Sequence, residues 1–154
     1  MREFRDIFYL RLALLIATRG TCWRRQVGGV AVNARGHVLS TGYNGVPSGL
    51  SHCRDGPLCA GARAPSGTDL DLCMAVHCET NLLAQCSDVQ QIHMIYLTCS
   101  PCFNCVKALI TSGCQRLVFL EEYPHPEAGV LWRSTGREWV LAEPLAPLES
   151  GEFW

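Results

Sequence analysis

Four polar residues lie in two short segments, and their types and spacing suit a metal centre. His77 and Glu79 are separated by one residue, and Cys102 and Cys105 follow Pro101 with two residues between them. Imidazole and thiolate are common zinc ligands, so His77, Cys102 and Cys105 form a candidate ligand set. Three protein ligands leave the fourth position of zinc open, where the metal lowers the pKa of water from ~16 towards ~7. Glu79 is the candidate proton carrier for such hydrolytic chemistry.

The spacing also predicts which elements hold these residues. Pro101 suits the first position of a helix, and the strand-like residues 95–98 lead into it. Cys102 and Cys105 would then lie in the first helical turn, where free N–H groups and the helix dipole favour thiolates. His77 would lie near the start of a second helix. The metal would therefore join two helix starts.

Each half of this pattern is less specific than the whole. A Cys-x-x-Cys pair alone also occurs in redox pairs and structural zinc knuckles, and His-x-Glu alone is less specific still. Together the two halves match the H-x-E…P-C-x-x-C signature of the zinc-dependent nucleobase deaminases. In such chemistry Glu79 would take the proton of water, protonate a ring nitrogen and assist the departure of ammonia.

Length and charge set the outer bounds on the fold and the substrate. With 154 residues, 48% of them hydrophobic, the chain can form one α/β domain with a core but not two comfortably. We expect one domain over residues 1–154, with a core over about 8–142 and a short C-terminal tail. The formal net charge of −1 offers no basic surface for polymeric nucleic acid, which favours a small-molecule substrate.

Cysteine content bears on the compartment. Ten cysteines in a chain without an apolar signal segment predict reduced thiols and metal ligation in the cytoplasm, because disulfide frameworks form in oxidising compartments. Residues 4–17 are rich in apolar side chains but carry interspersed charges, which predicts an amphipathic packing helix. Length and charge exclude a membrane span there, so no membrane partner is expected.

The order of the predicted elements indicates a sheet with parallel crossovers. A long segment at 44–72, rich in Gly, Pro, Ser and Asp, is expected to be a functional loop. Strands are expected at 27–33, 37–43, 93–99, 116–121 and 138–142. Helices are expected at 4–17, 73–86, 101–112 and 124–135.

Residues 8–142 resemble the deoxycytidylate (dCMP) deaminases of bacteria and viruses, within the cytidine deaminase superfamily. Gly42-Tyr43-Asn44-Gly45 is similar to the G-Y-N-G segment of that family. Further similar positions are Pro47, Gly49, His52-Cys53, Cys22 and the segment Phe119-Leu120-Glu121-Glu122-Tyr123. In the superfamily the residue between His and Glu is usually Ala, whereas this chain has Cys78.

The resemblance implies a three-layer α/β fold of the cytidine deaminase type, with a mixed five-stranded sheet flanked by helices. It implies hydrolytic conversion of dCMP to dUMP and ammonia, in a homo-oligomer that is commonly a hexamer. Many members respond to dCTP as activator and dTTP as inhibitor, and Mg2+ would accompany such a triphosphate. Gly42, Asn44 and Gly45 are the allosteric candidates.

Substrate contacts are expected on both sides of the metal ligands. Tyr123 matches the family tyrosine beside the nucleotide, and Ser100 directly precedes the P-C-x-x-C segment. The backbone N–H of Cys78 is expected to approach the pyrimidine carbonyl, and Asn44 to contact sugar or phosphate. Arg24 is the preferred phosphate contact, since a guanidinium pairs bidentately with phosphate. The alternatives are Arg19 and Arg25, or a solvated loop.

Other cysteines suggest a second metal. Some family members hold a structural zinc through cysteines placed as Cys22, Cys53, Cys59 and Cys73 are. A four-thiolate site would offset the entropy lost on ordering the long loop. Four unligated thiols, or His52 in place of one cysteine, are the alternatives. The residues expected to be core or surface side chains without metal are Cys86, Cys99, Cys114, His37, His93 and His125.

Other functions remain open on the sequence alone. A tRNA adenosine deaminase would share the metal motif, but it needs a positive surface and no G-Y-N-G loop with extra cysteines. A single-strand DNA cytosine deaminase has the same charge difficulty. A nucleoside cytidine deaminase usually has Cys in place of His77, and an inactive zinc module would lack Glu79. The sequence does not rank dCMP against its 5-substituted forms or dCTP.

Overall fold

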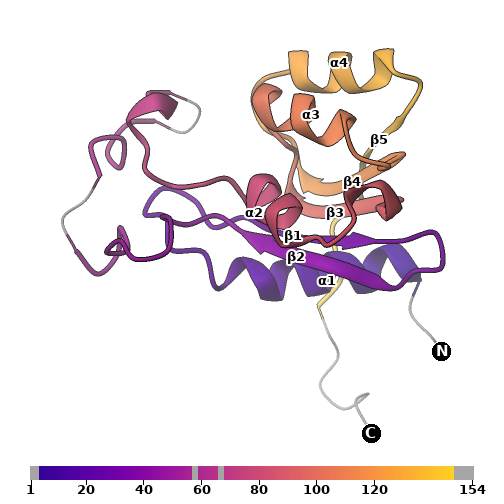
Figure 1. The fold of residues 1–154 in the computed structure, drawn as a ribbon, viewed down its shortest axis with the longest axis horizontal. Helices are drawn as coiled ribbons and strands as arrows, with labels where there is room; N and C mark the ends of the chain where they lie inside the picture. The colour runs from indigo at the N-terminus through magenta and orange to yellow at the C-terminus, as the bar shows by residue number, and fades with distance from the viewer. Residues whose placement is uncertain (1–3, 57–58, 66–67, 148–154) are drawn as a thin grey trace, which may run out of the picture.

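A computed structural model describes residues 4–56, 59–65 and 68–147 (Figure 1). The two ends of the predicted single domain, including most of the predicted tail, lie outside these described residues. Among them, no helix is long and apolar enough to cross a membrane.

The centre of the fold is a mixed five-stranded sheet. Its strands are β1 (Gly28–Val32), β2 (Val38–Tyr43), β3 (Met94–Cys99), β4 (Arg116–Glu121) and β5 (Glu138–Leu141), in the order β2-β1-β3-β4-β5. β1 is antiparallel to both β2 and β3, whereas the β3–β4 and β4–β5 pairs are parallel. The predicted α/β class and the mixed sheet are therefore confirmed.

Helices cover both faces of this sheet, which makes three layers (Figure 1). α1 (Arg5–Ala17) packs on β1 and β3 from one side. The opposite side carries α2 (Cys78–Gln85), α3 (Phe103–Ile110) and α4 (Glu127–Ser134). Two short 3-10 turns lie at Leu70–Leu72 and Val89–Gln91.

Alternate residues of the central strands supply the two cores. Leu97 of β3 and Phe119 of β4 are paired in register and are fully buried on the side of α2, α3 and α4. Tyr96 and Val118 are paired next to them and are buried on the side of α1. Successive residues of these strands therefore point to opposite faces of the sheet, as the pleat of a β-strand requires.

The helix starts differ from the predicted ones. α2 begins at Cys78 instead of residue 73, because Gly45 and Val76 exchange backbone hydrogen bonds of 3.2 and 2.8 Å and hold the preceding segment extended. α3 begins at Phe103, so Cys102 is its N-cap and Pro101 precedes the helix. His77 is likewise the N-cap of α2. The metal-ligand candidates therefore lie at the helix boundaries.

Candidate active site

The structure brings His77, Cys102 and Cys105 together. Their donor atoms all lie within 4.8 Å of one another, and His77 Nδ1 is 3.5 Å from each sulfur. Within the described ranges this is the one group of three or more His, Cys, Asp or Glu side chains that meets this spacing. One imidazole and two thiols, arranged this closely, are a donor set that suits zinc and leaves a coordination position free.

Two elements present these donors. Cys102 and Cys105 lie at the start of α3, directly after β3, and His77 lies at the start of α2. Both helices therefore direct their positive ends and free N–H groups towards the donor set, which favours thiolates and other anions there. The predicted meeting of two helix starts is thus present in the structure.

The two thiols and the imidazole change one another's pKa values through hydrogen bonds. Hydrogen bonding from Cys105, and then from His77, lowers the pKa of Cys102 to about 4. The hydrogen bond between His77 and Cys102 raises the pKa of His77. The hydrogen bond between Cys105 and Cys102 raises the pKa of Cys105 by a larger amount. The lowered pKa favours the thiolate form of Cys102, and thiolate is the form that binds zinc.

Glu79 lies in the first turn of α2 and is 5% exposed. Burial is the main cause that raises the pKa of its carboxyl above the usual value. A carboxyl whose pKa is shifted towards neutrality can both accept and release a proton under physiological conditions. The position and burial of Glu79 therefore suit the predicted proton carrier.

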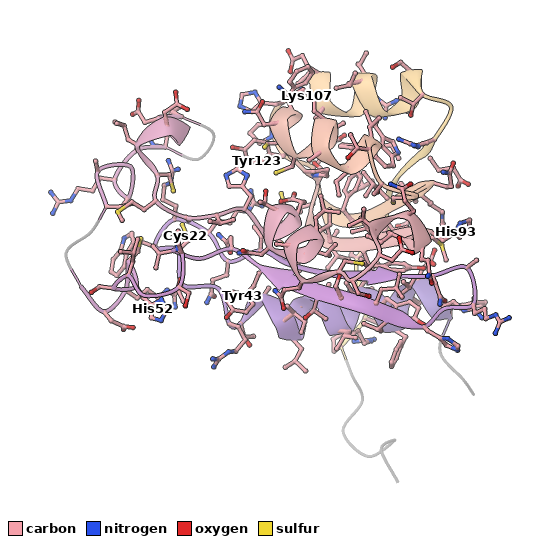
Figure 2. All side chains as sticks on the ribbon, viewed as in Figure 1. Cys22, Tyr43, His52, His93, Lys107 and Tyr123 are labelled. Atoms are coloured by element: carbon pink, nitrogen blue, oxygen red, sulfur yellow. The ribbon has the colours of Figure 1, made fainter. Side chains whose placement is uncertain are left out.

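A pocket adjoins the donor set and collects every predicted substrate contact. Its walls come from the helix starts, from the ends of β3 and β4, and from the segments flanking β1 and β2. The predicted contacts among its lining residues are Arg24, Asn44, Cys78, Ser100 and Tyr123. Arg25, which was only an alternative, and Cys99, which was expected to be a core residue, also line it. Figure 2 shows Tyr123 on the side of the molecule that faces the long loop, with His93 at the far end of the sheet.

Asn44 is bound to backbone atoms on the opposite strand segment. Its Oδ1 accepts a hydrogen bond of 2.7 Å from the Val27 N–H, and its Nδ2 donates one of 2.7 Å to the Arg25 carbonyl. The side chain is buried, so these bonds fix the G-Y-N-G segment against residues 25–27. Asn44 therefore positions the backbone of Arg25 at the pocket wall.

Ser100 has a similar supporting contact. Its Oγ accepts a hydrogen bond of 2.7 Å from the Tyr123 N–H, and its own N–H donates to the Glu121 carbonyl at 2.8 Å. Ser100 is 4% exposed. Its hydroxyl therefore holds Tyr123 at the pocket, a role that its position in the sequence did not indicate.

The neighbouring arginines have different partners. Arg24 Nη1 donates to the carbonyls of Ala64, Pro65 and Thr68 at 3.4, 3.2 and 2.9 Å, so its guanidinium ties the long loop to the pocket wall. Arg25 instead forms an ion pair with the exposed carboxylate of Glu121 at the end of β4. Arg19, the third arginine considered, lies just after α1 and is exposed, and it is not among the pocket residues.

The four cysteines considered for a second metal lie in one region, on or beside the long loop. Cys53 and Cys59 are buried together, Cys73 packs against them, and Cys22 is buried close enough to influence the pKa of Cys53. In the part of the chain that the structure describes, no three of these thiols have all their sulfur atoms within 4.8 Å of one another, with or without His52. The second metal site thus stays a prediction, and the gathered thiols are its support.

The remaining expected positions can also be placed. Gly42 lies in β2 beneath α2, and Gly45 pairs with Val76 at the pocket entrance. Cys114 is buried in the core and Cys86 packs against it, as expected of core side chains. Among the histidines, His125 lies beside Tyr123, with ring centroids 5.3 Å apart and ring planes tilted by 54°.

Known proteins provide an independent comparison. Residues 4–121 match the family described as the cytidine and deoxycytidylate deaminase zinc-binding region. A deoxycytidylate deaminase of Mycobacterium phage D29 is 35% identical over 122 residues, which cover 76% of this chain and 94% of that one. The deoxycytidylate deaminase of Saccharomyces cerevisiae is 32% identical over 125 residues, which cover 80% of this chain but 39% of the yeast protein.

A solved structure has the same fold. The dCMP deaminase from the cyanophage S-TIM5, in complex with dCMP and dUMP, superposes with a TM-score of 0.73 at 23% identity and covers 92% of this chain and 99% of that one. The family match over most of the chain, the phage relative and the shared fold agree with the resemblance noted from the sequence. The chain therefore belongs to the cytidine and deoxycytidylate deaminase family.

Proposed function

We propose that the chain is a zinc-dependent dCMP deaminase that converts dCMP and water to dUMP and ammonia. The observation that carries this proposal is the buried Glu79, which lines one pocket with His77 and Cys102 and contacts the third donor, Cys105. The names of the phage and yeast relatives, and the dCMP and dUMP bound by the cyanophage enzyme, support the choice of substrate.

The residues of the pocket divide the chemistry between them. Zinc held by His77, Cys102 and Cys105 would supply the Lewis acidity that makes water a nucleophile at neutral pH. Glu79 would take a proton from that water, transfer it to the ring nitrogen next to the reacting carbon, and later assist the departure of ammonia. Tyr123, held by Ser100, would contact the nucleotide, and the Cys78 N–H would donate to the pyrimidine carbonyl.

For the phosphate we now favour Arg25 over Arg24. The guanidinium of Arg24 is already bonded to loop carbonyls, whereas Arg25 lines the pocket with its backbone held by Asn44 and its side chain paired with the exposed Glu121. A phosphate can displace or share such a surface ion pair at low cost, because exposed pairs contribute little to stability. Arg25 would then pair with the monophosphate.

A second zinc at Cys22, Cys53, Cys59 and Cys73 would be structural. Small movements of the long loop would bring the gathered sulfurs into a closed four-thiolate site. We also propose a cytoplasmic location, where cysteines stay reduced and can ligate metal. Metal analysis that finds two zinc ions per chain would support this site, and one zinc per chain would count against it.

Regulation and assembly are further parts of the proposal. Gly42, Asn44 and Gly45 would respond to dCTP, with Mg2+, as activator and to dTTP as inhibitor. Unchanged hyperbolic kinetics during a triphosphate titration would exclude this regulation.

We also propose that residues 1–154 form one domain and that the chain is a homo-oligomer. Exposed apolar side chains on and before α1, such as Phe4, Phe8 and Leu15, would be covered by a second copy, which sedimentation equilibrium would detect.

Product analysis tests the proposed substrate directly. Purified zinc-loaded protein is given dCMP, 5-methyl-dCMP, dCTP, deoxycytidine and an adenosine-containing tRNA stem-loop, and ammonia and the deaminated product are measured. We expect turnover of the monophosphates and rank the two bases from their kcat/KM values. Turnover of the RNA alone would replace this proposal with a tRNA deaminase, and turnover of the nucleoside at the rate of dCMP would contradict the role of the phosphate.

A further inference from the structure

Two paired glycines form a gap in the sheet beneath the first turn of α2. Gly29 of β1 and Gly42 of β2 are partners in the antiparallel ladder. A Cβ at Gly42 would lie 2.4 Å from the Cys78 carbonyl oxygen and 2.7 Å from the Leu82 nitrogen. A Cβ at Gly29 would lie 2.7 Å from Leu97 Cδ2 and 3.0 Å from Cys78 Sγ. The gap therefore lets the helix approach the sheet at backbone contact distance.

The thiol of Cys78 occupies this gap. It is 1% exposed, and its Sγ donates a hydrogen bond to the Gly42 carbonyl at a distance of 3.1 Å. One turn further along α2, Asn81 Nδ2 donates to the Tyr43 carbonyl at 2.8 Å. Cys78 and Asn81 lie on the same face of the helix because they are three residues apart. Two consecutive carbonyls of β2 thus anchor the start of α2.

Cys78 lies between two candidate site residues at the start of α2, namely the N-cap His77 and Glu79. Cys78 separates His77, whose Nδ1 lies 3.5 Å from both metal-binding sulfurs, from the buried Glu79. A shift or rotation of the first turn would move both side chains relative to Cys102 and Cys105, which belong to α3. The orientation of the first turn therefore controls the geometry between the proton carrier and the donor set.

We propose that Cys78 is a positioning residue. Its thiol lies against the Gly29–Gly42 pair and is bonded to the Gly42 carbonyl, which fixes the height and rotation of the start of α2. This placement aligns Glu79 and His77 with Cys102 and Cys105. This inference rests on the proposed function for its catalytic consequence. An alanine at this position, as in the resembling family, has no donor for the Gly42 carbonyl and leaves part of the gap empty. The thiol of Cys78 is accommodated by the sheet, close to Gly29 and bonded to the Gly42 carbonyl.

Three proteins test the proposal: the native chain, Cys78→Ala and Cys78→Ser. The alanine variant is expected to lower kcat on dCMP about 3- to 10-fold with KM changed less than 2-fold, because misplaced catalytic groups affect the reaction more than binding. Cys78→Ser is expected to restore kcat to within about 2-fold of native, since its hydroxyl can donate to the same carbonyl. A purely packing role would lower thermal stability in both variants without this split in kcat.

A second readout does not depend on turnover. Cobalt in place of zinc gives visible absorption bands that report the arrangement of the His77, Cys102 and Cys105 ligands. We expect the bands to shift in Cys78→Ala and to return in Cys78→Ser. If the bands shift and return in this way but the native protein does not convert dCMP, the proposed function is refuted and the positioning role is supported. Native-like kcat and spectrum in the alanine variant, or a serine variant no closer to native than alanine, would overturn the inference.

Discussion

The two sulfur-rich regions of this molecule are built in contrasting ways. Cys102 and Cys105 lie at the start of a helix that follows a buried strand, with His77 at the start of another helix, and the three donor atoms are already clustered within 4.8 Å. Cys53 and Cys59, with their two neighbouring cysteines, lie on or beside an irregular loop and have no equally tight cluster among the described residues. Regular structure thus preorganises the first set, whereas the second set would rely on the proposed structural zinc to complete its order.

The two neighbouring arginines follow the same division. Arg24 holds three carbonyls of the loop, while Arg25 is held by Asn44 and Glu121 on the side of the sheet. Changes in the preorganised region should therefore affect chemistry and binding without loosening the fold. Changes in the loop region should loosen the loop first and affect the chemistry only through the pocket wall that it supports.

The largest expected effect comes from removing one sulfur of the preorganised set. Cys105→Ser should lose the catalytic zinc and reduce dUMP formation more than about 10³-fold, because the remaining ligands cannot hold the metal in a productive geometry. The fold should survive, since the helix starts are held by packing. Metal analysis, steady-state kinetics and far-UV circular dichroism check this, with Cys86→Ser as the control. Full zinc content with a normal rate would show that Cys105 is not a ligand.

The arginine pair gives the next largest effect. Arg25→Ala should raise KM for dCMP by about 10- to 100-fold and leave KM for deoxycytidine nearly unchanged, because a charged hydrogen bond to phosphate contributes about 1.5–3 kcal/mol. Arg24→Ala, the matched control, should affect both substrates equally. Selective loss of the monophosphate in Arg24→Ala would restore the original prediction from the sequence and contradict the division between the two regions.

The loop cysteines should behave in the opposite way to Cys105. Cys59→Ser is expected to lose one of two zinc ions, to increase proteolytic cleavage within residues 44–72, and to lower kcat/KM only about 10-fold through the disturbed pocket wall. Zinc content, limited proteolysis and kinetics are measured on the same preparation. A native protein with one zinc per chain, or a variant with an unchanged cleavage rate, would show that these cysteines do not hold a structural zinc.

The smallest expected effect concerns the support of Tyr123. Ser100→Ala removes the acceptor of the partly buried Tyr123 N–H and should lower kcat/KM about 3- to 10-fold, since a typical hydrogen bond contributes about 0.5–1.5 kcal/mol. Ser112→Ala is the matched control, because this buried serine bonds the Leu109 carbonyl and is not among the pocket residues. Equal losses in the two variants would indicate a general effect on stability.

The comparison also explains what the sequence predicted. Local patterns sufficed for the strands, whose alternate residues such as Tyr96 and Leu97 face different cores, and for the motif that joins His77 to the Cys-x-x-Cys pair. The start of α2 was predicted five residues too early, because the Gly45–Val76 bridge that prevents helix formation there is a long-range contact.

Contacts between distant segments also changed the interpretation of several side chains. The bonds of Asn44 to residues 25–27, of Arg24 to residues 64–68 and of Ser100 to Tyr123 join parts of the chain whose approach no local pattern predicts. The sequence placed these residues at the site, but their partners show them supporting its walls. Positions near the chemistry were therefore predictable, whereas the assignment of positioning roles required the fold.

The most direct test of the central claim compares native protein with Glu79→Gln, both loaded with zinc, in the conversion of dCMP to dUMP. The variant keeps the size of the side chain and all three metal ligands, so zinc content and fold should match the native protein. We expect dUMP and ammonia in equal amounts from native protein and a kcat at least about 10³-fold lower in the variant, because the proton carrier is lost. A fully zinc-loaded Glu79→Gln protein that forms dUMP at the native rate would contradict this expectation.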